Sequence, residues 1–189
     1  MITHRISVVL CIVVLFCTWC SSISRTGQAI SFDGFTMSIR EAYEPVSTSL
    51  IENKQILNKV LKSFKLPSDQ WFDDNLIVTT STIAQELDYE QFRTVNTNKL
   101  RDQVVGYQAW NKELISFDCG PETIPGIYVT FSVKDTFIDG IDTYYLAQYQ
   151  FVAHGTGYII STATIDPKEQ ESLRSAIQTL SCPTAATTS

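Results

Sequence analysis

The chain has 189 residues, of which 44% are hydrophobic and 18% are charged, and its formal net charge is −6. This composition is typical of a globular protein and excludes a wholly disordered chain. A chain of this length buries enough apolar surface to fold without a metal ion. An acidic surface repels phosphate groups, so the charge argues against a nucleic-acid-binding protein.

The N-terminus has the pattern of a targeting segment. Arg5 precedes a run, Ile6–Cys17, that is apolar except for Ser7. The run is shorter than the roughly 20 residues that span a bilayer, and it has the length of the apolar part of a signal peptide. We therefore predict a signal peptide at 1–24, a single domain at 25–182 and a disordered tail at 183–189. The expected location is the periplasm or the extracellular space.

Two alternatives remain open for this segment. It could be retained as an uncleaved anchor, or it could be lipidated at Cys17 or Cys20. Bacterial lipidation requires a small residue before the modified cysteine, whereas Phe16 and Trp19 stand there. We expect membrane contact only if the segment is retained or lipidated.

Signal-peptide cleavage would also change the cysteine count. It would leave Cys119 and Cys182, and two cysteines in an exported chain predict one disulfide. Closing a loop of roughly 60 residues stabilises a fold by about 4 kcal/mol in the chain-entropy model. The alternative is a pair of buried free thiols.

The first third of the mature chain is predicted to hold one strand and one helix. Residues 24–33 are polar and are expected to be poorly ordered. The alternation from Phe35 to Ile39 favours a strand. Ser47 or Thr48 can then cap a helix to about Phe64, because apolar residues recur at spacings of three and four.

The middle of the chain is predicted to alternate between strand and helix. Leu76–Ile83 and Tyr107–Phe117 are expected to be strands. Asp88 and Gln91 have the spacing of a capping box, and the helix that they open extends to about Val104.

Three successive strands follow, joined by turns at Asp139–Gly140 and His154–Gly157. The strands are predicted at Ile127–Val133, Thr143–Ala153 and Tyr158–Ile165. The second of them is apolar on both faces, so both faces must be covered.

A last helix closes the chain. Asp166 is its expected N-cap, Pro167 its first residue and Glu169 the second half of a capping box. The whole order predicts an α+β fold, with a largely antiparallel sheet and helices on both faces.

The C-terminal half resembles the PsbP-like proteins. The matching features are Gln148 in a central strand, the glycine turn after it, and an aromatic-led strand from Tyr158 to Thr162, followed by the acidic-capped helix. This family of α/β/α sandwiches includes the oxygen-evolving photosystem subunit P, the Ran-binding Mog proteins and small bacterial envelope proteins. The resemblance covers Trp71 to Cys182. The early helix departs from the family pattern, which opens with strands.

The resemblance implies a binding or scaffolding role and supplies no catalytic motif. Some relatives, the EagR chaperones, hold hydrophobic helices of secreted toxins. We therefore predict an exported, non-catalytic protein-binding domain of the cell envelope that needs no cofactor. An immunity protein against a toxin is a special case of this prediction. The main alternative is a carrier that holds a small apolar ligand between sheet and helix.

Aromatic and acidic residues gather in two predicted loop regions, which we nominate as the partner-binding site. The nominated residues are Trp71, Phe72, Asp73, Asp74, Asp135, Asp139 and Asp142. Their carboxylates could steer a basic partner, whereas the simpler and favoured interpretation of such charges is that they are solvated loop residues. The last three do not have the alternating spacing of a calcium loop, so no metal site is predicted.

No catalytic residue is predicted. His154 is the only histidine after the targeting segment, and it lies beside two glycines in an expected turn. A hydrolase that uses it would need a nucleophile elbow, and the chain has no Gly-x-Ser-x-Gly motif.

Overall fold

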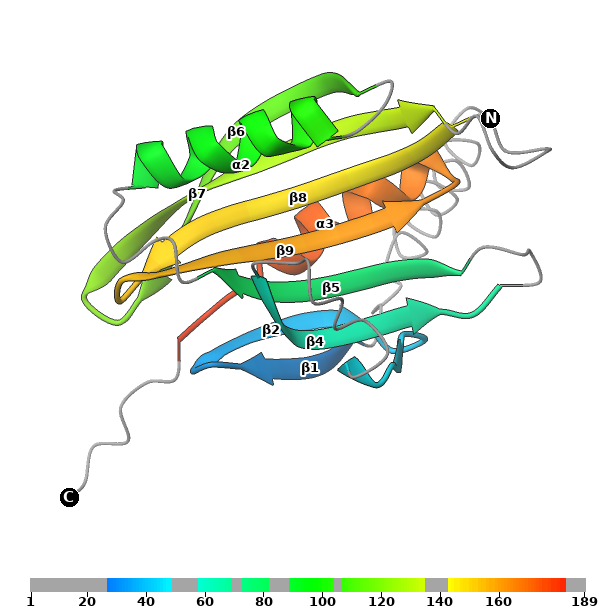
Figure 1. Cartoon of the computed structure of the whole chain (residues 1–189). Coiled ribbons are helices and arrows are strands. Elements are labelled where there is room, and N and C mark those ends of the chain that lie inside the picture. Colours follow the sequence, from blue (N-terminus) through cyan, green and yellow to red (C-terminus); the bar gives the residue numbers. More distant parts are fainter. Residues whose placement is uncertain are drawn as a thin grey trace, which may run out of the picture.

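The computed structural model describes residues 27–48, 58–68, 73–81, 89–103, 107–134 and 143–182. They form a two-stranded hairpin, a seven-stranded antiparallel sheet and two α-helices (Figure 1). The elements are β1 (Gly27–Phe32), β2 (Phe35–Arg40), β3 (Glu44–Pro45), β4 (Asn58–Leu66), β5 (Asp74–Ser81), α2 (Tyr89–Gln103), β6 (Gln108–Cys119), β7 (Glu122–Lys134), β8 (Thr143–Ala153), β9 (Thr156–Thr164), the 3-10 helix η4 (Pro167–Glu169) and α3 (Gln170–Ile177). The strand order in the sheet is β3-β4-β5-β9-β8-β7-β6. The prediction of a largely antiparallel α+β fold is therefore confirmed.

The two α-helices contact opposite faces of the sheet (Figure 1). On one face, Phe92 of α2 packs against Val152 and Ile159. On the other face, Leu173 of α3 belongs to the main core, together with Ile160 of β9. Successive side chains of a strand point to opposite faces, so the neighbours Ile159 and Ile160 assign each helix to its own side.

The main core is aromatic and lies on the α3 face of the sheet. The rings of Phe151 and Tyr158 stack with centroids 4.9 Å apart, and Phe35 and Phe117 meet Phe151 edge-on. The β1–β2 hairpin supplies Phe35, so this hairpin and α3 together cover one face. Offset and edge-to-face pairs of this kind add to the stabilisation from burial alone.

The first strand, β1, corrects the prediction that residues 24–33 are poorly ordered. Ile30 and Phe32 are buried, and the strand pairs with β2, which was predicted correctly. Residues 24–26 lie outside the described residues. The hairpin turn is Asp33–Gly34, with positive φ at both positions. This is the geometry of a type I′ turn, for which Asp-Gly is a preferred sequence.

The strand β4 shows that the predicted helix to Phe64 is wrong over the described residues, because residues 58–64 are extended. The strand pairs Val60 with Thr79 and Phe64 with Leu76, and a bulge lies between Val60 and Lys62. The bulge places Val60 and Phe64 on opposite faces of the sheet. Val60 and Phe64 are four residues apart, the spacing of one face of a helix, which explains why the sequence pattern predicted a helix here. Residues 49–57 lie outside the described residues.

The cap of the last helix follows the prediction in part. Asp166 is the N-cap, and its Oδ1 accepts a hydrogen bond from the Lys168 N–H at 2.9 Å. The reciprocal half of the capping box is wrong, since the Glu169 carboxylate pairs with Arg40. The Asp166 N–H instead donates to the Thr164 hydroxyl at 3.0 Å.

The other predicted elements lie close to their predicted places. The expected strands β5, β6, β7, β8 and β9 and the helix α2 are all present. The turn after β8 has two residues, His154 and Gly155, both with positive φ, so β9 begins earlier than predicted. Asp88 and the Asp139–Gly140 turn lie outside the described residues.

The sheet has two dissimilar edges. The edge strand β3 has only two residues, and one of them is Pro45. The opposite edge strand, β6, has 12 residues. Short edge strands and prolines discourage the addition of further strands, whereas a long edge exposes a row of backbone groups.

Candidate functional site

The sheet register brings the two nominated loop regions to one end of the sheet, which we call the loop end. Leu66 of β4 pairs with Asp74 of β5, and Lys134 of β7 pairs with Thr143 of β8. Tyr145 of β8 pairs with Thr164 of β9, whose neighbour Ala163 pairs with Asn75 of β5. Residues 69–72 and 135–142 therefore connect strands at this same end.

Five of the seven nominated residues cannot be placed further. These are Trp71, Phe72, Asp135, Asp139 and Asp142, which lie outside the described residues. Their role in binding stays a prediction. The other two, Asp73 and Asp74, are described and have different surroundings.

Asp73 organises the end of the β4–β5 connection. Its Oδ1 accepts a hydrogen bond from the Ser68 N–H at 3.0 Å, and its Oδ2 lies 3.3 Å from the Lys65 Nζ. The Ser68 N–H, followed by Lys65, lowers the pKa of the Asp73 carboxyl. Asp73 therefore carries a negative charge at neutral pH and stays partly exposed, so it can contribute to the field at the loop end.

The Asp74 side chain is only partly exposed to solvent, and its carboxyl contacts residues of the neighbouring strand. Burial raises the pKa of its carboxyl, and the nearby negative charge of Glu169 acts in the same direction. Hydrogen bonds from the Thr164 hydroxyl and the Ile165 N–H oppose this shift. These contacts tie Asp74 to the junction of β5 and β9, which the sequence alone did not indicate. Its role in binding stays a prediction.

Replacing Asp74 by asparagine is expected to flatten the pH dependence of stability above the ordinary carboxyl range. Because the folded pKa is raised, the unfolded chain ionises this carboxyl first. Its contribution to stability is present below the unfolded pKa and is lost as the pH rises through the folded pKa. Urea unfolding of both chains over a pH series measures the difference. Parallel stability profiles for the two chains would contradict this assignment.

A polar cluster at the base of α3 supports the loop end. Arg40 at the end of β2 pairs with Glu169, which joins the hairpin to the start of the helix. Tyr43 lies close to this pair, and its hydroxyl is hydrogen-bonded to Ser172. Burial, with the Asp74 charge, raises the pKa of Tyr43 to about 12. The cluster therefore fixes the hairpin against α3 at neutral pH.

The described residues of the loop end hold no cluster of metal-ligating side chains. Over all the described ranges, no three His, Cys, Asp or Glu side chains gather to hold a metal ion. His154 lies at the opposite end of the sheet, exposed in the β8–β9 turn. Of the helices in the described part, none is long and apolar enough to span a membrane.

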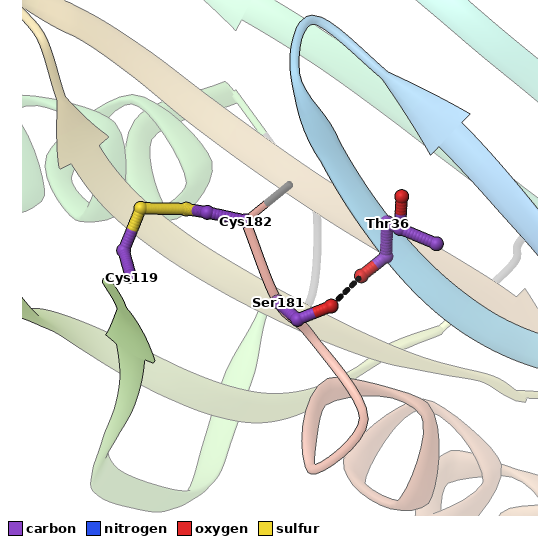
Figure 2. Close-up of a disulfide and its surroundings, with 4 residues drawn as sticks. All are labelled: Thr36, Cys119, Ser181 and Cys182. Atoms are coloured by element: carbon purple, nitrogen blue, oxygen red, sulfur yellow. Dashed lines mark hydrogen bonds between the residues drawn. A yellow bond between two sulfur atoms is a disulfide. The ribbon is translucent and has the colours of Figure 1, made fainter. Parts of the chain in front are cut away.

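The disulfide lies at the opposite end of the sheet from the loop end. Cys119 at the end of β6 is bonded to Cys182, with the two Cα atoms 4.9 Å apart (Figure 2). Next to it, Ser181 and Thr36 exchange two backbone hydrogen bonds of 2.9 Å. The Ser181 hydroxyl also donates to the Thr36 carbonyl at 3.4 Å (Figure 2). The predicted disulfide is thus present, and it fixes the segment that follows α3 between β6 and β2.

Two hollows in the described part bear on the ligand-carrier alternative. One, of about 150 Å³, lies between β2 and α3 and is lined by Ser38, Arg40, Ser172, Ser175 and Thr179 among others. The second, of about 510 Å³, lies between β6 and the end of α3. Sites for small apolar ligands are mostly lined by apolar side chains. The first hollow combines its hydroxyl groups with the apolar side chains of Ile39 and Ala176.

Comparison with known proteins supports the fold and goes no further. No family model matches the chain, and no curated protein is similar to it. The solution structure of cyanobacterial PsbP (CyanoP) from Synechocystis sp. PCC 6803 has a TM-score of 0.55 and 14% identity, covering 86% of this chain and 96% of that one. The crystal structure of PA94, a Pseudomonas aeruginosa protein of unknown function, has a TM-score of 0.50 and 11% identity, covering 81% of this chain and 94% of that one.

These likenesses show that the chain has a PsbP-like fold, as the sequence features predicted. Each neighbour is covered almost completely, so the shared fold is that of the whole domain rather than of one motif. At identities this low the comparison speaks for the fold alone, because one fold can carry many functions.

Proposed function

We propose that the chain is an exported, non-catalytic domain of the cell envelope that binds a protein through its loop end. The observation that carries this proposal is the sheet register, which brings both nominated loop regions to one end of the sheet. Loops held on a rigid sheet are common sites of binding. The PsbP-like fold is compatible with a domain that does no catalysis.

Charge favours a partner with a basic surface. By sequence, the loop end holds Asp69, Asp135, Asp139 and Asp142 beside the described Asp73. Acidic groups gathered at one end speed the encounter with a basic protein and select against an acidic one. Trp71 and Phe72 would supply the apolar anchors that protein interfaces usually need.

Export is supported by the N-terminal pattern and by the disulfide. A disulfide between the end of β6 and the end of the chain persists in an oxidising compartment, and it is rare in a reducing cytosol. A fusion of the first 30 residues to a reporter that is active only after export tests this part. Reporter activity is expected, and a reporter retained in the cytoplasm would contradict it.

Binding is tested by affinity capture from the native envelope fraction with the processed, oxidised chain. We expect one stoichiometric partner, whose retention falls by about tenfold or more when Trp71 and Phe72 are replaced by alanine. Glu122→Gln is the matched control, because Glu122 is exposed at the opposite end of the sheet. Equal retention by all three chains would contradict the assignment to the loop end.

A copurified apolar molecule would favour the carrier instead. Native mass spectrometry of the same preparation detects it directly. A variant that has lost the partner must also keep the circular dichroism of the parent chain, since loss of folding would show that Trp71 and Phe72 are core residues.

A further inference from the structure

The edge strand β6 has one row of backbone groups that no described strand covers. Ser116 of β6 pairs with Pro125 of β7, and proline has no N–H to donate. Ser116 and Pro125 are therefore a non-hydrogen-bonded pair. Hydrogen-bonded and non-hydrogen-bonded pairs alternate along an antiparallel ladder, so Ile115 and Phe117 are hydrogen-bonded to β7. It follows that the N–H and C=O groups of every second residue point away from the sheet. The outward-facing residues are Lys112, Leu114, Ser116 and Asp118. The Lys112 N–H donates to the Asn111 Oδ1 at 2.8 Å, a bond that a second strand would replace.

The side chains of these four residues share one face of the strand and are all exposed. Leu114 is 70% exposed and is the only large hydrophobic residue in the described part that is so exposed. Lys112 stands two residues before it and Asp118 four residues after it. The Thr123 hydroxyl donates to the Asp118 Oδ1 at 3.0 Å, which holds this carboxylate in place along the strand.

We propose that β6 pairs antiparallel with β6 of a second copy, to form a symmetric dimer centred on Ile115. Between two copies of β6, only backbone groups that point outward in both copies can form hydrogen bonds. The outward-facing residues all have even numbers, so Lys112 must lie opposite an even-numbered residue of the second copy. In the register centred on Ile115, Lys112 lies opposite Asp118 and Leu114 lies opposite Ser116. The twofold symmetry repeats both pairs, so each dimer holds two Lys112–Asp118 ion pairs.

The charges select this register over its neighbours. A shift of the second strand by two residues places Lys112 opposite Ser116 or Gly120, and both ion pairs are then lost. Cross-strand pairs of opposite charge stabilise a sheet, and like charges directly opposite each other destabilise it. In the register centred on Ile115, the positive Lys112 of each copy thus lies opposite the negative Asp118 of the other copy.

The α3 side of the edge has a hollow that side chains of the second strand could fill. The hollow of about 510 Å³ lies there, lined on the strand by Ile115 and Phe117 and on the helix side by Ile177 and Leu180 among others. Directly opposite residues of paired strands point to the same face. Ile115 of the second copy would therefore stand beside Ile115 at this hollow, and its side chain would bury apolar surface against the hollow's lining.

Sedimentation equilibrium of the processed, oxidised chain over a concentration series tests the dimer. We expect a monomer–dimer equilibrium that Lys112→Glu and Asp118→Lys each weaken by about tenfold, because each places like charges opposite each other twice. The double variant Lys112→Glu/Asp118→Lys is expected to restore the parent affinity. Lys59→Glu is the control, since Lys59 is an exposed lysine of β4.

Ser116→Pro provides a test that does not depend on charge. It removes an outward-facing N–H and leaves the β6–β7 ladder intact, so it should abolish the dimer without unfolding the chain. A parent chain that stays monomeric at every concentration would overturn the inference. A dimer that tolerates both Ser116→Pro and the single charge changes would overturn it as well. The outcome is separate from the loop-end proposal, which concerns the loops between strands and not the backbone groups of the edge strand.

Discussion

Replacing Cys119 and Cys182 by serine is expected to lower the free energy of unfolding by about 4 kcal/mol. The disulfide joins residues 63 positions apart, and the chain-entropy model gives this amount for a loop of that length. The bond also holds the end of the chain next to Ser181, whose backbone bridges to Thr36 of β2. Its removal should therefore loosen the β1–β2 hairpin as well as the C-terminus.

Urea unfolding measures this effect in the oxidised parent chain, the reduced parent chain and the double serine variant. The reduced parent is the matched control, because it differs from the oxidised chain only in the bond between the two sulfur atoms. We expect the reduced parent and the serine variant to unfold at similar urea concentrations, both well below the oxidised parent. A serine variant as stable as the oxidised chain would show that the bond does not constrain the fold.

Gly126→Ala is expected to destabilise the fold by about 1–3 kcal/mol, the usual range for overpacking a dense core. The Tyr149 ring lies across Gly126, and a Cβ there would overlap both the ring and the hydroxyl oxygen. The same hydroxyl donates to the Ile115 carbonyl at 2.7 Å, so the ring crosses β7 to reach β6. In a strand interior, alanine ordinarily stabilises the fold relative to glycine. A loss of stability in Gly126→Ala would therefore indicate the clash with Tyr149.

A double-mutant cycle with Tyr149→Ala separates the clash from the general effect of the substitution. Gly126→Ala should destabilise much less in the Tyr149→Ala background, and the coupling is expected at about 0.5–3 kcal/mol. Tyr149→Phe is the matched control, because it removes the hydrogen bond and keeps the ring. Additive effects of the two substitutions would show that the ring can move aside.

The local signals of turns and caps carried most of the correct predictions. Gly155 marks the end of a strand and Asp166 the start of a helix, and each acts through a few neighbouring residues. The Asp33–Gly34 turn carried the same kind of signal. Had it been read as a hairpin turn, β1 could have been predicted from the alternation of Ile30 and Phe32.

The parts that the sequence did not predict depend on long-range partners. The bulge in β4 is visible only once Val60 and Phe64 are paired with β5. The Glu169 carboxylate bonds Arg40, which is distant in sequence, instead of its own helix cap. Asp74 was nominated for its charge, and its burial depends on the neighbouring strand β9. Periodicity within one segment contains none of this information.

The two unequal edges of the sheet set a limit on how large an assembly can become. On the side of β3, the edge consists of Pro45 with its neighbour and of the part of β4 that β3 leaves uncovered. That part of β4 has a bulge and the lysines Lys59 and Lys62, features that discourage a further strand. A dimer through β6 leaves neither chain with a free β6 edge for a third chain. In the proposed dimer, strand pairing would therefore stop at two chains and would not continue into a fibril.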